Sequence, residues 1–249
     1  MKKTLLVMFL LVSAGLSAKA QILIDIQFGG NSYNSTVSDI QTGAGVVGSL
    51  GDYWNNIAFS STIYSPLTTS LQTVGNTSSG VTLVITPNNG ALGEYSRGSG
   101  GSSLPSTVLS NLYEGFLNVD ANPYPYNPVG GDFKFSGLTA GSTYNLYLYS
   151  APDRDRESAW SLNGATAVQV GYNSSATSLL SPNNYIVLTG TADSGGNLDL
   201  VASQLSGNEI DVNGFQLQEQ VVPEPSVYAL LVGGLLTLVI IKRKRSRLA

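Results

Sequence analysis

The chain of 249 residues contains no cysteine and no histidine, and only 11% of its residues are charged. Without a thiol or an imidazole, the protein cannot form a disulfide, a Ser-His-Asp or Cys-His nucleophile, or a His/Cys zinc site. Carboxylates, hydroxyls, Lys and Tyr are the catalytic material that remains. From these groups we predict no specific catalytic residue. Without disulfides, the stability of the domain must depend on packing.

Residues 1–20 have the three parts of a secretory signal peptide. Lys2 and Lys3 precede the apolar run Leu5 to Leu16, and Ala18-Lys19-Ala20 forms a small-residue cleavage site. We expect cleavage between Ala20 and Gln21, so that the working domain, residues 21–222, is exported.

The other end of the chain carries an uncharged run, Val227 to Ile241, followed by a basic tail over residues 242–249. As a helix the run would be about 22 Å long, short for a hydrocarbon core of about 30 Å. A bilayer can thin to accommodate such a helix. We expect a transmembrane helix with the basic tail cytoplasmic and the domain outside. A buried core helix is the alternative interpretation.

The segment before this helix is Val222-Pro223-Glu224-Pro225-Ser226. Its two prolines keep the chain extended and accessible to an enzyme at the membrane surface. Together with the short helix and the basic tail, the segment resembles the PEP-CTERM sorting signal of exported bacterial proteins. The resemblance implies that an exosortase recognises Pro223, Glu224 and Pro225 and processes residues 223–249. It also implies a protein that reaches the cell surface or accompanies extracellular polysaccharide.

Residues 21–222 are strongly acidic. They contain 15 acids and four cations (Arg97, Lys134, Arg154 and Arg156), a net charge of about −11. Such a domain lacks the positive patch that nucleic-acid binding requires. The acidic excess has two interpretations, solubility or binding of Ca²⁺, which takes oxygen ligands. The sequence implies no other cofactor.

Short runs rich in β-branched and aromatic residues recur between Gly, Asn, Ser and Pro, and predict an all-β fold, an antiparallel β-sandwich. Within Thr143 to Tyr149, the residues Tyr144, Leu146 and Leu148 share one face, and Asn145 and Tyr147 share the other. The predicted strands are 22–28, 81–86, 132–135, 143–149, 165–170, 185–189, 197–202 and 210–217.

Four segments depart from this pattern. Ile210 and Val212 are out of phase with Phe215 and Leu217, which predicts a β-bulge at Asn213-Gly214. A helical stripe from Leu104 to Phe116 predicts one short helix that ends near Gly115. Residues 29–56 and 91–103 are expected to be long loops.

A second resemblance covers most of the domain. Its pieces are Ile22 to Phe28, Trp54 to Ile57, the strands around Phe133-Lys134-Phe135 and Tyr144 to Tyr149, the hairpin Trp160 to Gly164, and Gly207 to Phe215. These pieces look like the jelly-roll, galactose-binding-like or carbohydrate-binding β-sandwiches of some PEP-CTERM proteins. The resemblance implies a fold, and fold alone does not determine function.

Trp54, with Tyr53 and Asn55 beside it, is the candidate ligand-binding site. Flat aromatic faces next to amides suit sugar rings, which stack on the ring and form hydrogen bonds at the rim. The alternative is that Trp54 anchors the core.

Asp153, Asp155 and Glu157 alternate with two arginines. In an extended chain these carboxylates share one face and could hold Ca²⁺, or supply a carboxylate pair for glycoside hydrolysis. A solvated loop is the alternative. We expect a non-catalytic, glycan-binding or matrix structural protein at the cell surface or in extracellular polymer, with a glycan-active hydrolase as the competing hypothesis.

Overall fold

The computed structural model describes residues 21–28, 42–58, 63–88, 92–96, 112, 115–120, 130–150, 157–170, 179, 181–206, 209–221 and 233–234. The chain divides into two compact units, Met1–Glu219 and Gln220–Ala249. Gly233 and Gly234 are helical. Residues 1–20, which we expect to be a signal peptide, and Pro223, Glu224 and Pro225 lie outside the described residues. Within the described part of the chain, no helix is both long enough and apolar enough to cross a membrane.

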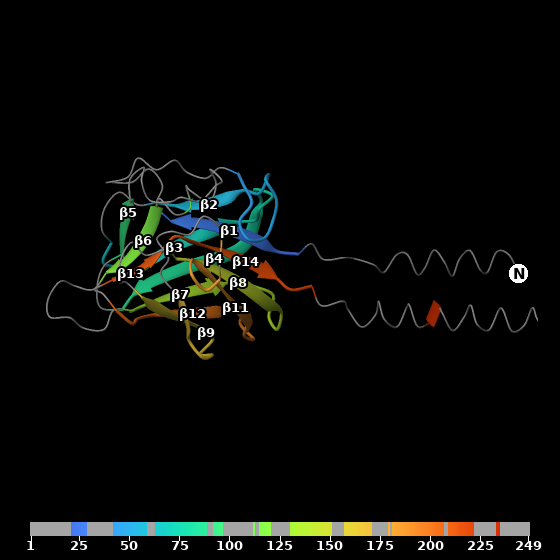
Figure 1. Ribbon diagram of the computed structural model, residues 1–249. Helices are drawn as coiled ribbons and strands as arrows, with labels where there is room; N and C mark the ends of the chain where they lie inside the picture. Colours follow the sequence, from blue (N-terminus) through green and yellow to red (C-terminus); the bar gives the residue numbers. More distant parts are fainter. Residues whose placement is uncertain are drawn as a thin grey trace, which may run out of the picture. The chain divides into compact units, whose positions relative to one another are not determined.

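The first unit contains a five-stranded sheet in the order β11-β8-β14-β1-β2 (Figure 1). Neighbouring strands are antiparallel, except that β1 and β2 are parallel. Its strands are β1 (Leu23–Phe28), β2 (Trp54–Ile57), β8 (Thr143–Tyr149), β11 (Tyr185–Thr191) and β14 (Gly214–Glu219). In β8 the side chains of Tyr144, Leu146 and Leu148 are buried, and those of Asn145 and Tyr147 are half-buried. The predicted alternation is therefore confirmed.

A six-stranded antiparallel sheet has the order β10-β9-β12-β7-β4-β3. Its strands are β3 (Leu67–Gln72), β4 (Ser78–Pro87), β7 (Gly130–Ser136), β9 (Ser158–Leu162), β10 (Val168–Val170) and β12 (Leu198–Gln204). Burial alternates along β7 and β12, so that one face of this sheet is apolar and buried while the other is exposed.

The apolar faces of these two sheets form the main core. Phe215 of β14 lies at its centre, with its ring centroid 5.5 Å from that of Phe28 and 5.5 Å from that of Phe133. Phe135 and Trp160 lie 6.1 and 6.4 Å from the same ring. Aromatic side chains from both sheets thus interlock, and the predicted antiparallel β-sandwich is confirmed.

A three-stranded sheet, in the order β13-β6-β5, lies beside the sandwich. Its strands are β5 (Leu92–Ser96), β6 (Gly115–Asp120) and β13 (Glu209–Val212). Asn213 separates β13 from β14 and donates from Nδ2 to the carbonyl oxygen of Gly115 (2.8 Å). The chain therefore changes sheets at Asn213.

The phase change predicted at Asn213-Gly214 is real, because Ile210, Val212, Phe215 and Leu217 all belong to the main hydrophobic core. The predicted bulge within one strand is wrong. The residues before Asn213 pair with β6, whereas those after it pair with β1 and β8.

Two other expectations need correction. Strand β5 lies inside the segment 91–103, which we expected to be a loop, and β2 begins at Trp54, inside the expected loop 29–56. Leu112 is helical, but Phe116, which we counted on the helical stripe, belongs to β6. Most of the expected helix lies outside the described residues.

Candidate functional site

Trp54 lies in the protein interior. Its side chain is 0% exposed, and its indole Nε1 donates to the carbonyl oxygen of Gly43 (2.9 Å). Trp54 packs with Leu112 and Tyr149, and the Trp54 and Tyr149 ring centroids lie 6.5 Å apart. The expectation of an exposed Trp54 face for a sugar is therefore wrong, because residues distant in the sequence cover the ring.

The two neighbours of Trp54 also have structural contacts. The Asn55 side chain is buried, and its Nδ2 donates to the carbonyl oxygens of Asp25 (2.9 Å) and Gln72 (2.8 Å). Its Oδ1 accepts from the backbone N–H of Gln72 (2.8 Å). Tyr53 is half-buried, and its backbone N–H donates to the carbonyl oxygen of Val74 (2.8 Å). Asn55 thus connects β1, β2 and β3.

A buried polar network lies between the five-stranded sheet and residues 46–47. Gln216 of β14 donates from Nε2 to Oδ1 of Asp25 (2.9 Å) and to the carbonyl oxygen of Val47 (2.8 Å). The Gln216 Oε1 accepts from the hydroxyl of Tyr149 and from the backbone N–H of Val47. The Tyr149 hydroxyl in turn accepts from the backbone N–H of Val46 (2.8 Å). The network fixes this segment to the face of the sheet opposite the main core.

Asp25 is the acidic member of this network and is fully buried. Burial raises the pKa of its carboxyl from 3.8 to about 8, the Gln216 hydrogen bond lowers it, and the charge of Asp52 raises it further. Among the described residues, Asp25 Oδ2 has no hydrogen-bond partner. Burial also raises the pKa of Tyr149. At neutral pH Asp25 is therefore mostly protonated, and Tyr149 is neutral.

The candidate metal residues can be followed only in part. Asp153 and Asp155 lie outside the described residues. The backbone N–H of Glu157 donates to Ser206 Oγ (3.0 Å), and its carbonyl oxygen accepts from Leu205 (2.9 Å). In the part of the chain that the structure describes, no three or more acidic side chains form a group that could hold a metal ion.

A second aromatic surface lies on β8, β11 and β14, on the face opposite the main core. Register pairs Tyr147 of β8 with Val187 of β11 and Gln216 of β14, and it pairs Asn145 with Thr189 and Gln218. We call this surface the tyrosine face, and it consists of Asn145, Tyr147, Tyr185, Val187, Thr189 and Gln218.

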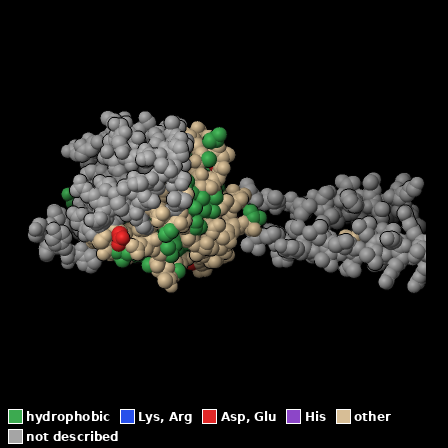
Figure 2. Space-filling model, in the orientation of Figure 1, with side chains coloured by type: hydrophobic (Ala, Val, Ile, Leu, Met, Phe, Trp, Pro, Cys, Tyr) green, Lys and Arg blue, Asp and Glu red, His purple; other side chains and the backbone are tan. Residues whose placement is uncertain are grey.

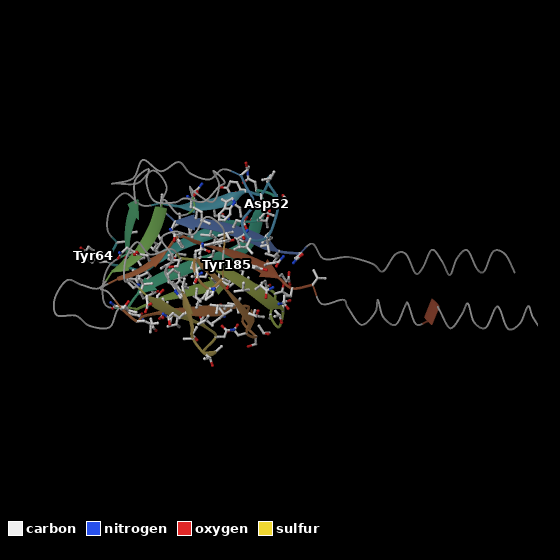
Figure 3. The ribbon with its side chains drawn as sticks, in the orientation of Figure 1. Asp52, Tyr64 and Tyr185 are labelled. Atoms are coloured by element: carbon white, nitrogen blue, oxygen red, sulfur yellow. The ribbon has the colours of Figure 1, made fainter. Side chains whose placement is uncertain are left out.

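The tyrosine face is accessible to solvent. Tyr147, Tyr185, Asn145 and Gln218 are half-buried, and Val187 is 42% exposed. Tyr185 lies against the strands of the five-stranded sheet, whereas the 81% exposed Tyr64 projects well away from it (Figure 3).

Hydrogen bonds hold the side chains of this face in place. The Tyr147 hydroxyl donates to Gln218 Oε1 (3.2 Å), and the Thr189 hydroxyl donates to Asn145 Oδ1 (2.9 Å). The Tyr185 ring packs beside Tyr149, with centroids 6.3 Å apart. Two ordered rings next to amides offer apolar stacking area with hydrogen-bonding groups at its rim.

We did not select these tyrosines as a site from the sequence, although part of the signal is there. The alternation in residues 143–149 places Tyr147 and Asn145 on the face away from the core. Tyr185 and Gln218 belong to β11 and β14, which lie on either side of β8 in the sheet but far from it in the sequence. The spacing of residues in the sequence does not reveal which strands pair.

No protein-family model matches the chain, and no curated protein matches it. Several solved structures are similar over part of it. The ANX2 ectodomain from Arabidopsis thaliana has a TM-score of 0.38 and 10% identity, and the match covers 53% of this chain and 40% of that one.

Two carbohydrate-binding modules are also similar. The family 35 module from Clostridium thermocellum has a TM-score of 0.30 and 15% identity, over 61% of this chain and 97% of the module. TmCBM61, solved with beta-1,4-galactotriose, has a TM-score of 0.33 and 9% identity, over 55% of this chain and 88% of the module. At these TM-scores the similarities say nothing about function. The argument for a function must therefore come from the chain's own residues.

Proposed function

We propose that this chain is an exported, non-catalytic β-sandwich protein that binds polysaccharide through the tyrosine face. The observation that supports this function is the pair of half-buried rings, Tyr147 and Tyr185, on a rigid sheet beside Asn145 and Gln218. Polysaccharides present repeated flat sugar faces with polar rims, and this combination of aromatic and amide groups fits them. Trp54 has no part in this site.

The affinity of one such site is modest. Favourable aromatic contacts contribute about 0.5 to 1.5 kcal/mol beyond area burial, so the loss of one ring weakens binding by about 2- to 13-fold. The many repeats of one polymer compensate for this modest affinity, because a second contact with the same polysaccharide molecule is intramolecular. The protein would therefore act as a matrix-associated binder rather than a tight receptor.

The ends of the chain would direct the protein to its location. Residues 1–20 direct export, and an exosortase-type enzyme recognises Pro223, Glu224 and Pro225 while residues 227–241 hold the precursor in the membrane. Processing would leave the sandwich at the cell surface or in extracellular polysaccharide.

Affinity electrophoresis in gels that contain soluble polysaccharides tests the binding function. Tyr147→Ala and Tyr185→Ala should each reduce retardation, and the double variant should abolish it. Tyr147→Phe, which keeps the ring, should retain most of the binding. Tyr64→Ala is the matched control, because Tyr64 is 81% exposed and lies outside the tyrosine face.

Unchanged retardation of the double variant would contradict the proposed site. Release of reducing ends from a retained polysaccharide would favour the hydrolase hypothesis instead, with Asp153, Asp155 or Glu157 as the acids to substitute.

A further inference from the structure

The tyrosine face contains no charged side chain. All six of its residues are neutral. The residue that pairs with Tyr147 on the next strand, Gln216 of β14, is neutral as well. The side of the domain drawn in Figure 2 is similar, since its described surface is mostly uncharged polar and apolar, with few carboxylates. A ligand on the tyrosine face therefore meets rings, amides and a hydroxyl, and no described counterion.

The described cation of the domain does not lie on the tyrosine face. Lys134 is the described cation among residues 21–222, and it lies on β7, on the exposed face of the six-stranded sheet. Register pairs it with Asp199 of β12. Two of the other three cations, Arg154 and Arg156, alternate with three acids in residues 153–157, so that this run has a net negative charge.

The long-range field of the domain has the same sign as an acidic polymer. With a net charge of about −11 over residues 21–222, the domain repels polyanions. The repulsion is strongest at low salt, where screening is weak and the Debye length reaches tens of ångströms. Desolvation of a carboxylate or sulfate against neutral side chains adds a further cost. From this charge distribution, which rests on the proposed function for its site, we infer that the tyrosine face selects uncharged polysaccharides and rejects uronate-rich or sulfated ones.

Matched polymer pairs test this selectivity with the full chain in detergent. The pairs are dextran with carboxymethyl dextran, hydroxyethyl cellulose with carboxymethyl cellulose, and starch with carboxymethyl starch. We expect the neutral member of a bound pair to retard the protein at least about fivefold more strongly at low salt. The difference should narrow as salt screens the repulsion.

A charge variant localises the effect. Val187→Lys places a cation within the tyrosine face, next to Tyr147, and it should raise the ratio of carboxymethyl to neutral binding several-fold. The matched control is Val201→Lys, because Val201 is 36% exposed and lies on β12 of the other sheet. This control should leave the preference unchanged.

The outcomes separate the two proposals. If the wild-type protein binds carboxymethyl polymers as well as or better than neutral ones, and the double variant Tyr147→Ala/Tyr185→Ala abolishes that binding, the selectivity is wrong and the binding function stands. If neither member of any pair retards the protein, both proposals fail. A Val201→Lys effect equal to that of Val187→Lys would also overturn the inference, because it would show that net charge alone sets the preference.

Discussion

Gln216 and Asp25 are register partners on the neighbouring strands β14 and β1, and Gln216 Nε2 donates to Asp25 Oδ1 at 2.9 Å. The hydrogen bond joins residues 191 positions apart in the sequence. It satisfies one oxygen of a buried carboxyl, while the other oxygen has no partner among the described residues. The pair holds a neutral acid within the sheet.

The stability of the domain should fall as the pH rises from about 4 to about 8. Burial raises the pKa of Asp25 to about 8, so the folded state keeps a proton that the unfolded state has lost above about pH 4. Within this window the folded state binds more protons, and the free energy of unfolding decreases by up to about 1.4 kcal/mol per pH unit. Above about pH 8 this contribution levels off.

Asp25→Asn tests this directly by urea unfolding over the same pH range. Asparagine can still accept from Gln216 and carries no ionisable proton. The variant should lose this pH dependence, so its stability relative to the wild type should increase steadily between about pH 4 and pH 8. Parallel profiles for the two proteins would show that Asp25 titrates normally in the folded state.

Trp54→Ala should destabilise the domain by about 3 to 5 kcal/mol, because the substitution empties a fully buried site and removes the hydrogen bond to Gly43. Thermal unfolding followed by circular dichroism measures the loss. Tyr64→Ala, at an 81% exposed position, should change stability by less than about 0.5 kcal/mol. If Trp54→Ala also lowered the stability by less than about 0.5 kcal/mol, Trp54 would have to be a surface residue.

Gly214→Ala should cost about 1 to 3 kcal/mol or more. A methyl group at Gly214 would overlap with the carbonyl oxygen of Ile26 and lie 2.9 Å from Leu112 Cδ1, so β14 would have to move away from β1. Gly51→Ala is the control, because a methyl group there meets no atom within 4 Å. Chemical unfolding of both variants gives the comparison, and equal stabilities would argue against the close approach.

The mature protein in its own host should lack Lys242 to Arg247. This expectation follows from the motif Pro223-Glu224-Pro225 before a short apolar run and a basic end. Intact mass of the protein isolated from its own host decides the question. Retention of the basic tail would leave residues 223–249 as a permanent anchor rather than a processing signal.

The sequence predicted strands best where the alternation is local. Residues 143–149 form β8 with the predicted ends, and half-buried and buried side chains alternate as predicted from Thr143 to Leu148. The strand β5 was missed because Leu92-Gly93-Glu94-Tyr95-Ser96 contains little that favours a strand by itself. Its pairing with β6 stabilises it.

The site was harder to predict, because burial is not a local property. Trp54 follows a glycine-rich segment and two polar residues, a context typical of a surface loop. It is buried because Gly43, Leu112 and Tyr149 converge on it. Asp25 likewise stands within an apolar run, and its neutral state depends on the long-range packing that removes it from water.

The position of β14 has a consequence for folding during synthesis. It is the last strand in the sequence, yet it lies third of five in its sheet, between β8 and β1. A chain that emerges from its amino terminus exposes the unpaired edges of β1 and β8 until residues 214–219 arrive. The five-stranded sheet therefore cannot form until almost the whole polypeptide has emerged, and a chain truncated before Gly214 leaves two strand edges open to pairing with other chains.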